Sequence, residues 1–227
     1  MIKKVFLFVF CILMLVSCGK LWRKYIFQGY TDFLIQFEQY DKKLTSHFPE
    51  LDSLKNIYSY TASGGGNADY YPKELILLIH YDSIRYYSIK KRIEKEAKNI
   101  VGAEDTNIIV AGKIFYFHDE LQEYIPYDNK ELGEKSYKRN MANMTSDLVI
   151  PYLGFDDNTA TYSGLTADSK IYHIETKFGK FHDTDTTNKE ESFKFYLTLP
   201  KRLKQGYSRG YALNDKQKFI EYWLIIW

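Results

Sequence analysis

The C-terminal segment places the strongest constraint on how this chain can fold. Residues Lys218–Trp227 read KFIEYWLIIW, an apolar run with almost no alternation of polar and apolar positions. A strand with one face in water alternates, whereas a strand covered on both faces does not. Asn214-Asp215, just before the run, favours a hairpin turn. The sequence therefore predicts a central strand at the C-terminus, covered on both sides.

Two helical patterns occupy the first half of the chain. Apolar residues recur at spacings of three and four from Tyr30 to His47, which predicts an amphipathic helix. A second helix is expected from Asp82 or Ser83, either of which can cap it, to about Asn99. The inner face expected for this second helix consists of Ile84, Tyr87, Ile93, Ala97 and Ile100.

Strand-like segments dominate the second half. Leu75–His80 fits either a buried strand or the first turns of a helix, and a short helix is favoured at about Glu134–Asn143. Runs rich in β-forming residues predict strands at Asn56–Thr61, Asn107–Phe117, Leu148–Leu153, Lys170–Phe178 and Ser192–Leu199. Helices early and strands late, without regular alternation, predict an α+β fold. N-terminal helices pack on a mostly antiparallel sheet, and the C-terminal strand is central.

The first eighteen residues have a different character. Lys3 and Lys4 precede Val5–Ser17, a run of about thirteen apolar or small residues. A membrane-spanning helix needs about 20 such residues, so this run is too short to cross a bilayer. A basic start, a short apolar stretch and a small residue at its end are typical of a secretory signal peptide.

Leu15-Val16-Ser17-Cys18 resembles the lipobox of bacterial lipoproteins. The resemblance implies that the Cys18 thiol receives a diacylglycerol, that a peptidase cuts between Ser17 and Cys18, and that the new amino group is acylated. Two or three acyl chains hold a protein stably at a membrane, whereas one chain holds it marginally. The alternative is an ordinary signal peptide, or an uncleaved anchor, that happens to contain a cysteine.

This reading divides the chain into a removed signal peptide (1–17), a lipidated membrane-proximal segment (18–24) and one α+β globular domain (25–227). Position 19 is Gly, not the Asp that retains many Gram-negative lipoproteins at the inner membrane. The resemblance therefore implies the outer membrane, facing the periplasm. No cofactor is expected beyond the covalent lipid on Cys18.

Processing at Cys18 changes the composition of the mature chain. The formal net charge falls from +2 to zero, because Lys3 and Lys4 leave and no acidic residue does. Cys11 also leaves and Cys18 carries the lipid, so no free thiol remains for catalysis or metal binding. A charge near zero argues against nucleic acid as a partner.

One segment matches a catalytic motif. Gly206-Tyr207-Ser208-Arg209-Gly210 has the G-x-S-x-G pattern of the α/β-hydrolase nucleophile elbow. No histidine follows Ser208, although the hydrolase order requires one, and no parallel β-α-β pattern surrounds it. The favoured interpretation is that the two glycines permit a tight turn in a connection.

A second group of residues could bind a metal. His173 and Glu175 share one face of the expected strand Lys170–Phe178, and His182 and Asp183 follow it. Two imidazoles and a carboxylate form an adequate catalytic zinc set, but no fixed-spacing motif supports one here. Surface histidines on a sheet are the commoner case, so these four residues remain candidates and no catalytic residue or metal ligand is assigned.

Tyrosine is the most unusual feature of the composition, with 21 in the chain. Tyr70-Tyr71, Tyr86-Tyr87 and Tyr124/Tyr127 are candidates for exposed recognition clusters, and core rims are the favoured alternative. The sequence predicts a lipid-anchored, non-catalytic binding or structural protein of the envelope, with membrane lipid and an envelope protein as partners. The alternatives are a periplasmic metal-dependent hydrolase using His173 and His182, and an immunity-type lipoprotein that neutralises a toxin.

Overall fold

The computed structural model describes parts of the chain between residue 28 and the C-terminus. The described residues are 28–32, 34–38, 41–50, 53–54, 57–63, 73–110, 139, 142–143, 145–154, 161–179 and 205–227. Residues 28–32 and 34–38 are helical and are called the N-terminal helical segment. The other elements are β1 (Ile57–Ser63), β2 (Lys73–His80), α2 (Ser83–Glu96), β3 (Asn99–Gly102), β4 (Ile109–Val110), β5 (Val149–Ile150), β6 (Ser169–Phe178), β7 (Gly206–Asn214) and β8 (Phe219–Ile226).

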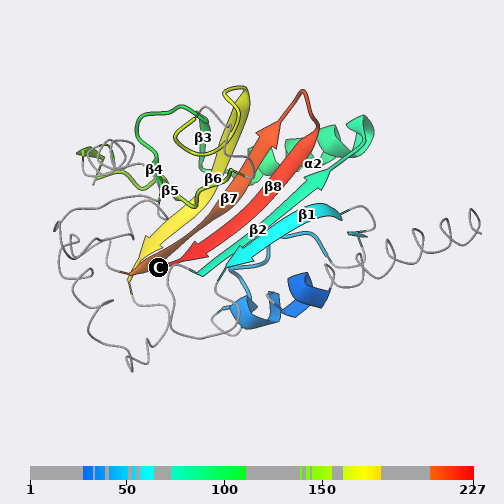
Figure 1. The fold of residues 1–227 in the computed structure, drawn as a ribbon, viewed down its shortest axis with the longest axis horizontal. Coiled ribbons are helices and arrows are strands. Elements are labelled where there is room, and N and C mark those ends of the chain that lie inside the picture. Colours follow the sequence, from blue (N-terminus) through cyan, green and yellow to red (C-terminus); the bar gives the residue numbers. More distant parts are fainter. Residues whose placement is uncertain are drawn as a thin grey trace, which may run out of the picture.

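Six strands form one antiparallel sheet in the order β1-β2-β8-β7-β6-β3 (Figure 1). β4 and β5 form a separate parallel pair. The fold is α+β with a mostly antiparallel sheet, as the sequence predicts. None of the described helices is long and apolar enough to span a membrane.

β8 lies inside the sheet, between β2 and β7. All eight of its residues are buried. At its middle, Trp223 lies opposite Ile76 of β2 on one side and Gly210 of β7 on the other. The prediction of a central C-terminal strand is confirmed. A continuous apolar run is stable in this position because both of its faces are removed from water.

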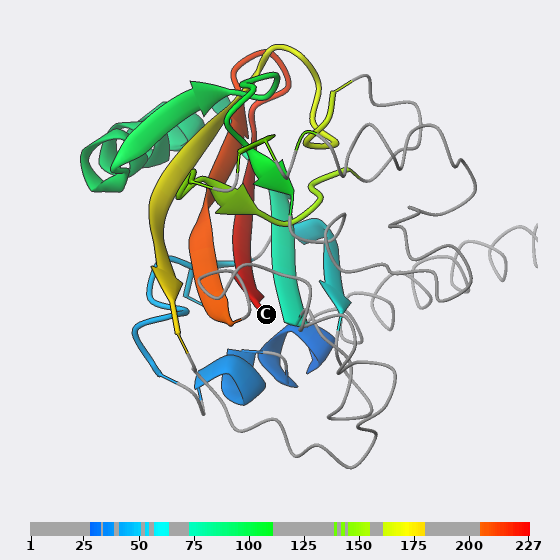
Figure 2. The ribbon, with the colours of Figure 1, turned by 90° about the vertical axis from the view of Figure 1, so that its left-hand side faces the viewer.

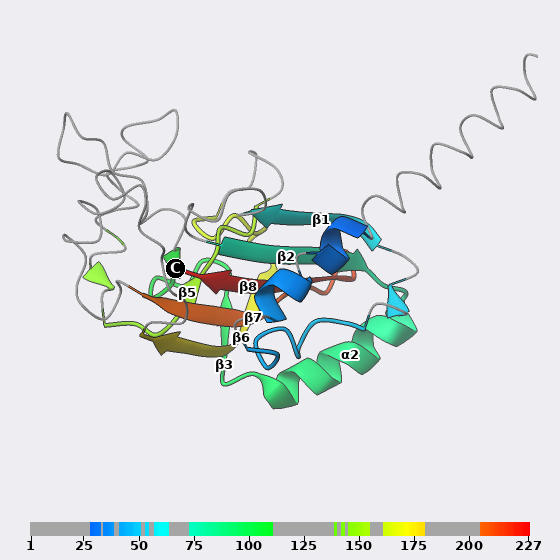
Figure 3. The ribbon, with the colours of Figure 1, turned by 90° about the horizontal axis from the view of Figure 1, so that it is seen from below.

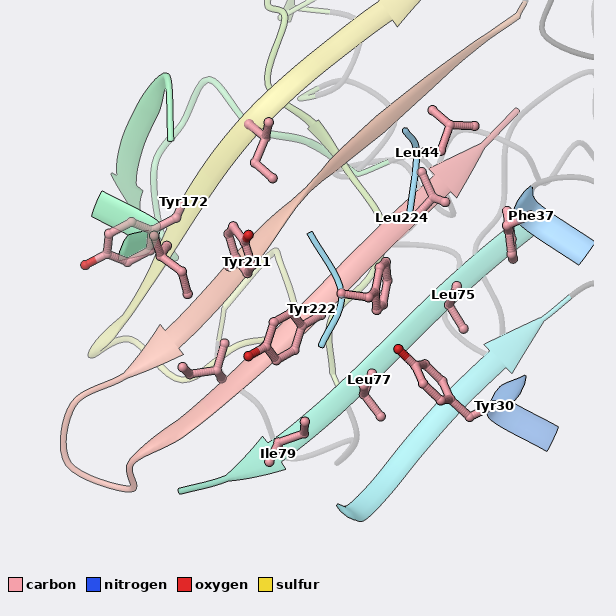
Figure 4. Packing of buried hydrophobic residues seen from close by; sticks show 14 of the residues in the cluster. Tyr30, Phe37, Leu44, Leu75, Leu77, Ile79, Tyr172, Tyr211, Tyr222 and Leu224 are labelled. Carbon is pink, nitrogen blue, oxygen red and sulfur yellow. The ribbon is translucent and has the colours of Figure 1, made fainter. Parts of the chain in front are cut away.

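Helices and turns cover one face of the sheet, which we call the helical face. The N-terminal helical segment, residues 41–50 and 53–54, and α2 pack against it (Figure 3). Figure 4 shows the packing of this layer. Its strand residues are Leu75, Leu77, Ile79, Tyr172, Ile174, Tyr207, Tyr211, Leu213, Ile220, Tyr222, Leu224 and Ile226.

The opposite face, which we call the loop face, is covered by residues 103–110, 148–154 and 161–165, which include β4 and β5 (Figure 2). Its strand residues are Ile76, Ile171, Ala212, Trp223 and Ile225, with Trp227 following β8. Both faces of the sheet are therefore buried, which accounts for the apolar character of both sides of β8.

The structure settles two local questions that the sequence left open. Leu75–His80 is part of strand β2. Asp82 is the N-cap of α2, and its Oδ1 accepts a hydrogen bond from the backbone N–H of Arg85 at 2.9 Å. The first amphipathic pattern is helical only as far as residue 38 within the described part, and residues 42–48 form turns that still bury Leu44 and Phe48.

The inner face expected for α2 is partly wrong. Tyr86 and Ile93 are buried, whereas Ile84 is 85% exposed and Tyr87 is 52% exposed. The Tyr86 hydroxyl donates a hydrogen bond to Asp215 in the β7–β8 hairpin at 2.8 Å. This contact and the packing of Tyr86 on the sheet set the rotation of the helix about its axis, which the periodicity of its own sequence does not specify.

Several predicted elements lie partly or wholly outside the described residues. Strand Ser192–Leu199 is wholly outside, and so is most of the helix at Glu134–Asn143. Of the strand predicted at Asn107–Phe117, the described part contains β4. The strand predicted at Leu148–Leu153 is represented by β5.

Candidate functional site

Polar side chains of β6 and β7 form a chain of hydrogen bonds buried on the loop face. Nε2 of His173 lies 2.8 Å from Oγ1 of Thr176, which lies 2.8 Å from Oγ of Ser208. The Ser208 hydroxyl donates to the backbone carbonyl of Glu175 at 3.3 Å. His173 is 2% exposed, and Ser208 is fully buried. The chain of contacts ends on a backbone carbonyl, within the sheet itself.

The hydrogen-bond partners of His173 determine which of its two ring nitrogens carries the proton. Nδ1 of the ring lies 3.4 Å from Nδ2 of Asn99, an amide nitrogen that can only donate, so Nδ1 accepts and Nε2 carries the proton. Burial, and to a smaller extent the charge of nearby Lys98, lower the pKa of His173 to about 4, so the ring is neutral at pH 7. An imidazole that already donates toward Thr176 is not placed to take a proton from Ser208. The group acts as a structural network within the sheet.

The two glycines of the G-x-S-x-G segment lie inside β7, so the interpretation of a tight turn is wrong. A Cβ on Gly210 would lie 2.5 Å from the carbonyl oxygen of Tyr172 and 2.7 Å from the ring of Trp223. A Cβ on Gly206 would lie 2.8 Å from the ring of Trp227. The glycines therefore make room for two tryptophan rings from the neighbouring strand and its end.

His173 and Glu175 do not share a face of the sheet, although strict alternation predicts that they do. The register between β6 and β7 shifts between these two residues, with His173 opposite Gly210 and Glu175 opposite Arg209. The irregularity places one extra residue in β6 and reverses which face the following side chains occupy. His173 stacks on Trp223 of the loop face, and Glu175 contacts Tyr207 of the helical face.

Glu175 belongs to a partly buried ion pair. Its Oε1 accepts hydrogen bonds from the Tyr207 hydroxyl at 3.0 Å and from Nε of Arg209 at 3.0 Å. Burial alone would raise the pKa of Glu175, but the Tyr207 hydrogen bond and the Arg209 charge together bring that pKa below its usual value. Arg209 also donates to the carbonyl of Lys43 at 2.6 Å and to Oγ of Ser46 at 3.1 Å. The pair ties the turns of residues 41–50 to the sheet.

Glu221 is a buried carboxyl that inspection of the sequence did not single out. It lies in β8, is 1% exposed, and its Oε1 has no hydrogen-bond partner among the residues that the structure describes. Burial raises the pKa of Glu221 well above its usual value and so favours the protonated side chain. Two residues further along, the indole Nε1 of Trp223 is also buried and has no hydrogen-bond partner in the described part of the chain. The signal in the sequence was a single acidic residue inside an apolar run.

The described tyrosines lie mostly in the core. Six of them are buried on the helical face: Tyr30, Tyr86, Tyr172, Tyr207, Tyr211 and Tyr222. The Tyr222 and Tyr81 hydroxyls lie 2.9 Å apart, and the Tyr211 hydroxyl donates to Glu96 of α2 at 2.7 Å. Of the proposed exposed clusters, Tyr86-Tyr87 has one buried and one exposed member. The other two clusters lie outside the described residues.

The remaining candidates also fall outside that part of the chain. They are the lipobox residues Leu15, Val16, Ser17 and Cys18, and the possible metal ligands His182 and Asp183. Within the described ranges, no three histidine, cysteine or acidic side chains come close enough to hold a metal ion. Metal binding by His182 and Asp183 stays a prediction.

Comparison with known proteins supplies no relative. No protein-family model matches the chain, and neither a curated protein nor a solved structure matches it. The functional proposal therefore rests on the residues of this chain and on their arrangement.

Proposed function

We propose that this protein is a lipid-anchored lipoprotein of the bacterial cell envelope that acts as a non-catalytic binding or structural protein. We place it at the outer membrane, facing the periplasm. The observation that carries the proposal is the order of the first eighteen residues. Two lysines, a short apolar run, Ser17 and Cys18 follow one another as in a lipoprotein signal peptide. Acylation at Cys18 would supply a stable anchor.

The arrangement of the reactive side chains supports a non-catalytic role. Ser208 donates its proton to a backbone carbonyl, His173 donates toward Thr176, and Glu175 is held by Arg209. Each of these groups is engaged in holding strands or turns together. His173 and Glu175 also lie on opposite faces of a sheet that is covered on both sides.

Lipidation is tested by replacing the two cysteines separately. Cys18→Ala should abolish incorporation of a clickable fatty acid and release the protein from the membrane fraction, because the acceptor thiol is lost. Cys11→Ala is the matched control, since this cysteine lies within the apolar run, and it should keep both the label and the membrane association. Label retained by Cys18→Ala would show that Cys18 is not the lipid attachment site.

Elemental analysis of the purified mature protein separates this proposal from the metal-dependent hydrolase. That alternative uses His173 and His182, and it requires a carboxylate ligand other than Glu175, whose carboxylate is paired with Arg209. The non-catalytic proposal expects no stoichiometric zinc. Bound zinc that is lost in His182→Ala would overturn it.

A further inference from the structure

Exposed apolar side chains collect on the helical side of the molecule. Ile35 of the N-terminal helical segment, and Ile84 and Tyr87 of α2, are all more than half exposed. Both helices cover the helical face of the sheet (Figure 3). Ile84 and Tyr87 are three residues apart in α2, so they are neighbours on one side of the helix. Single exposed apolar residues are common, whereas α2 exposes two large apolar side chains on one turn.

Basic side chains surround this pair. Residues 82–97 and 214–218, which include α2 and the β7–β8 turn, contain seven basic and four acidic residues. Three of the four acidic groups are engaged: Asp215 with Lys90, Asp82 with Arg85, and Glu96 as acceptor from Tyr211. Local charge is therefore positive around an apolar pair, which is the pattern of helices that lie on anionic lipid surfaces.

Cations also lie directly against the apolar pair. Nζ of Lys218 donates to the Tyr87 hydroxyl at 2.7 Å and lies 4.5 Å from the centre of its ring. The Arg85 side chain is 64% exposed and lies 3.5 Å from Asp82. Lys91 is exposed two turns after Ile84, on the same side of α2. These long side chains can place their charges at lipid headgroups while the apolar tips enter the interface.

The distance from the lipid attachment site limits where the domain can lie. Gln28, where the N-terminal helical segment begins in the described chain, is only ten positions after Cys18. Even a fully extended chain of that length spans no more than about 35 Å. If Cys18 is acylated, as the proposed function holds, the N-terminal helical segment lies within about 35 Å of the lipid attachment site.

We propose that the first turns of α2 dock on the anionic headgroups of the membrane that holds Cys18. Ile84 and Tyr87 enter the headgroup region, and Arg85, Lys91 and Lys218 contact lipid phosphates. The helical face of the sheet is then turned toward the bilayer, and the loop face toward the aqueous side. This inference rests on the proposed function for the anchor, but the surface itself is defined by α2 and the β7–β8 turn.

The test exploits the absence of free thiols from the lipidated mature chain. Ile84→Cys, and Thr106→Cys as a matched control, each introduce one exposed thiol for an environment-sensitive fluorophore. Thr106 lies in the segment that covers the loop face. The labelled lipoproteins are reconstituted into phosphatidylglycerol-containing vesicles that carry a lipid-bound quencher. We expect about a twofold loss of fluorescence at position 84 and none at position 106, because an interfacial helix enters the headgroup region.

Three results would overturn the docking proposal: no quenching at position 84, equal quenching at both positions, or equal quenching at position 84 in purely zwitterionic vesicles. The unsubstituted protein tests the anchor separately. It should take up no thiol-reactive dye, because Cys18 is acylated. If it does react, the anchor proposal fails. The vesicle measurement is then repeated with Cys18→Ser added, which reads the docking of α2 without the anchor.

Discussion

Glu221 shows how one residue can depart from the pattern around it. It is the one charged residue of β8, and it is buried between Leu78 of β2 and Ala212 of β7. An unpaired carboxylate in such a site would carry a large desolvation cost, so the folded protein keeps the group protonated. The folded state therefore binds a proton that the unfolded state releases once the pH exceeds the usual carboxyl pKa.

This difference predicts a stability that falls with rising pH. Below the unfolded pKa near 4.5, both states bind the Glu221 proton and stability does not depend on pH through this group. The folded-state pKa is raised, so above pH 4.5 the free energy of unfolding decreases as the pH rises. The decrease from this group is about 1.4 kcal/mol per pH unit until the folded-state pKa is reached. Glu221→Gln removes the titration and should be more stable than the unsubstituted protein at pH 8, with a smaller gain at pH 5. Urea unfolding at both pH values measures this, and identical pH dependence in the two proteins would contradict it.

At the scale of elements, the β6-β7-β8 part of the sheet depends on matched glycines and tryptophans. Gly206 and Gly210 in β7 are spaced like Trp223 and Trp227, and antiparallel pairing brings Gly210 to Trp223 and Gly206 to Trp227. The space above Gly210 also allows the His173 ring to stack on Trp223, with ring centres 6.3 Å apart. Glycine has a low intrinsic propensity for strands. Here it nevertheless permits side chains of β6 and β8 to pack closely over β7.

Gly210→Ala should therefore destabilise the protein by about 1 to 3 kcal/mol, because the new methyl group meets a backbone carbonyl and a buried ring. Gly102→Ala in β3 is the matched control. A Cβ there meets nothing within 4 Å, so the change in stability should stay within about 0.5 kcal/mol. Thermal or urea unfolding compares the two variants, and equal effects would show that the tryptophan packing does not constrain Gly210.

At the scale of the whole molecule, β8 is the element on which both packed layers depend. Its residues alternate between the helical face, through Tyr222 and Leu224, and the loop face, through Trp223 and Ile225. β8 also pairs along its full length with both neighbours. Loss of its second half would expose apolar surface on both faces and leave the edges of β2 and β7 unpaired.

Removal of residues 223–227 should therefore abolish soluble expression. The missing residues include two buried tryptophans, and each large core truncation alone costs about 3 to 5 kcal/mol. Expression of the soluble domain, followed by fractionation of the lysate, measures the outcome against the full-length domain. A soluble truncated protein with the circular dichroism of the full-length domain would contradict the central role of β8.

The sequence by itself determined the features that depend on neighbouring residues. These are the apolar run of β8, the start of α2 to within one residue (Asp82 or Ser83), and an α+β order of elements. Hydrophobic periodicity and helix capping act over a few residues, so a local pattern contains the information. The lipobox prediction is equally local and depends on residues 1–18 alone.

Only the tertiary structure decided how these elements face one another. The irregularity in β6 separates His173 from Glu175, and the contact of Tyr86 with Asp215 turns Ile84 toward solvent. The register of β7 against β8 converts an apparent catalytic motif into a packing site for tryptophans. Strand register and helix rotation arise from contacts between residues far apart in the chain, where a local pattern carries no information about the partner.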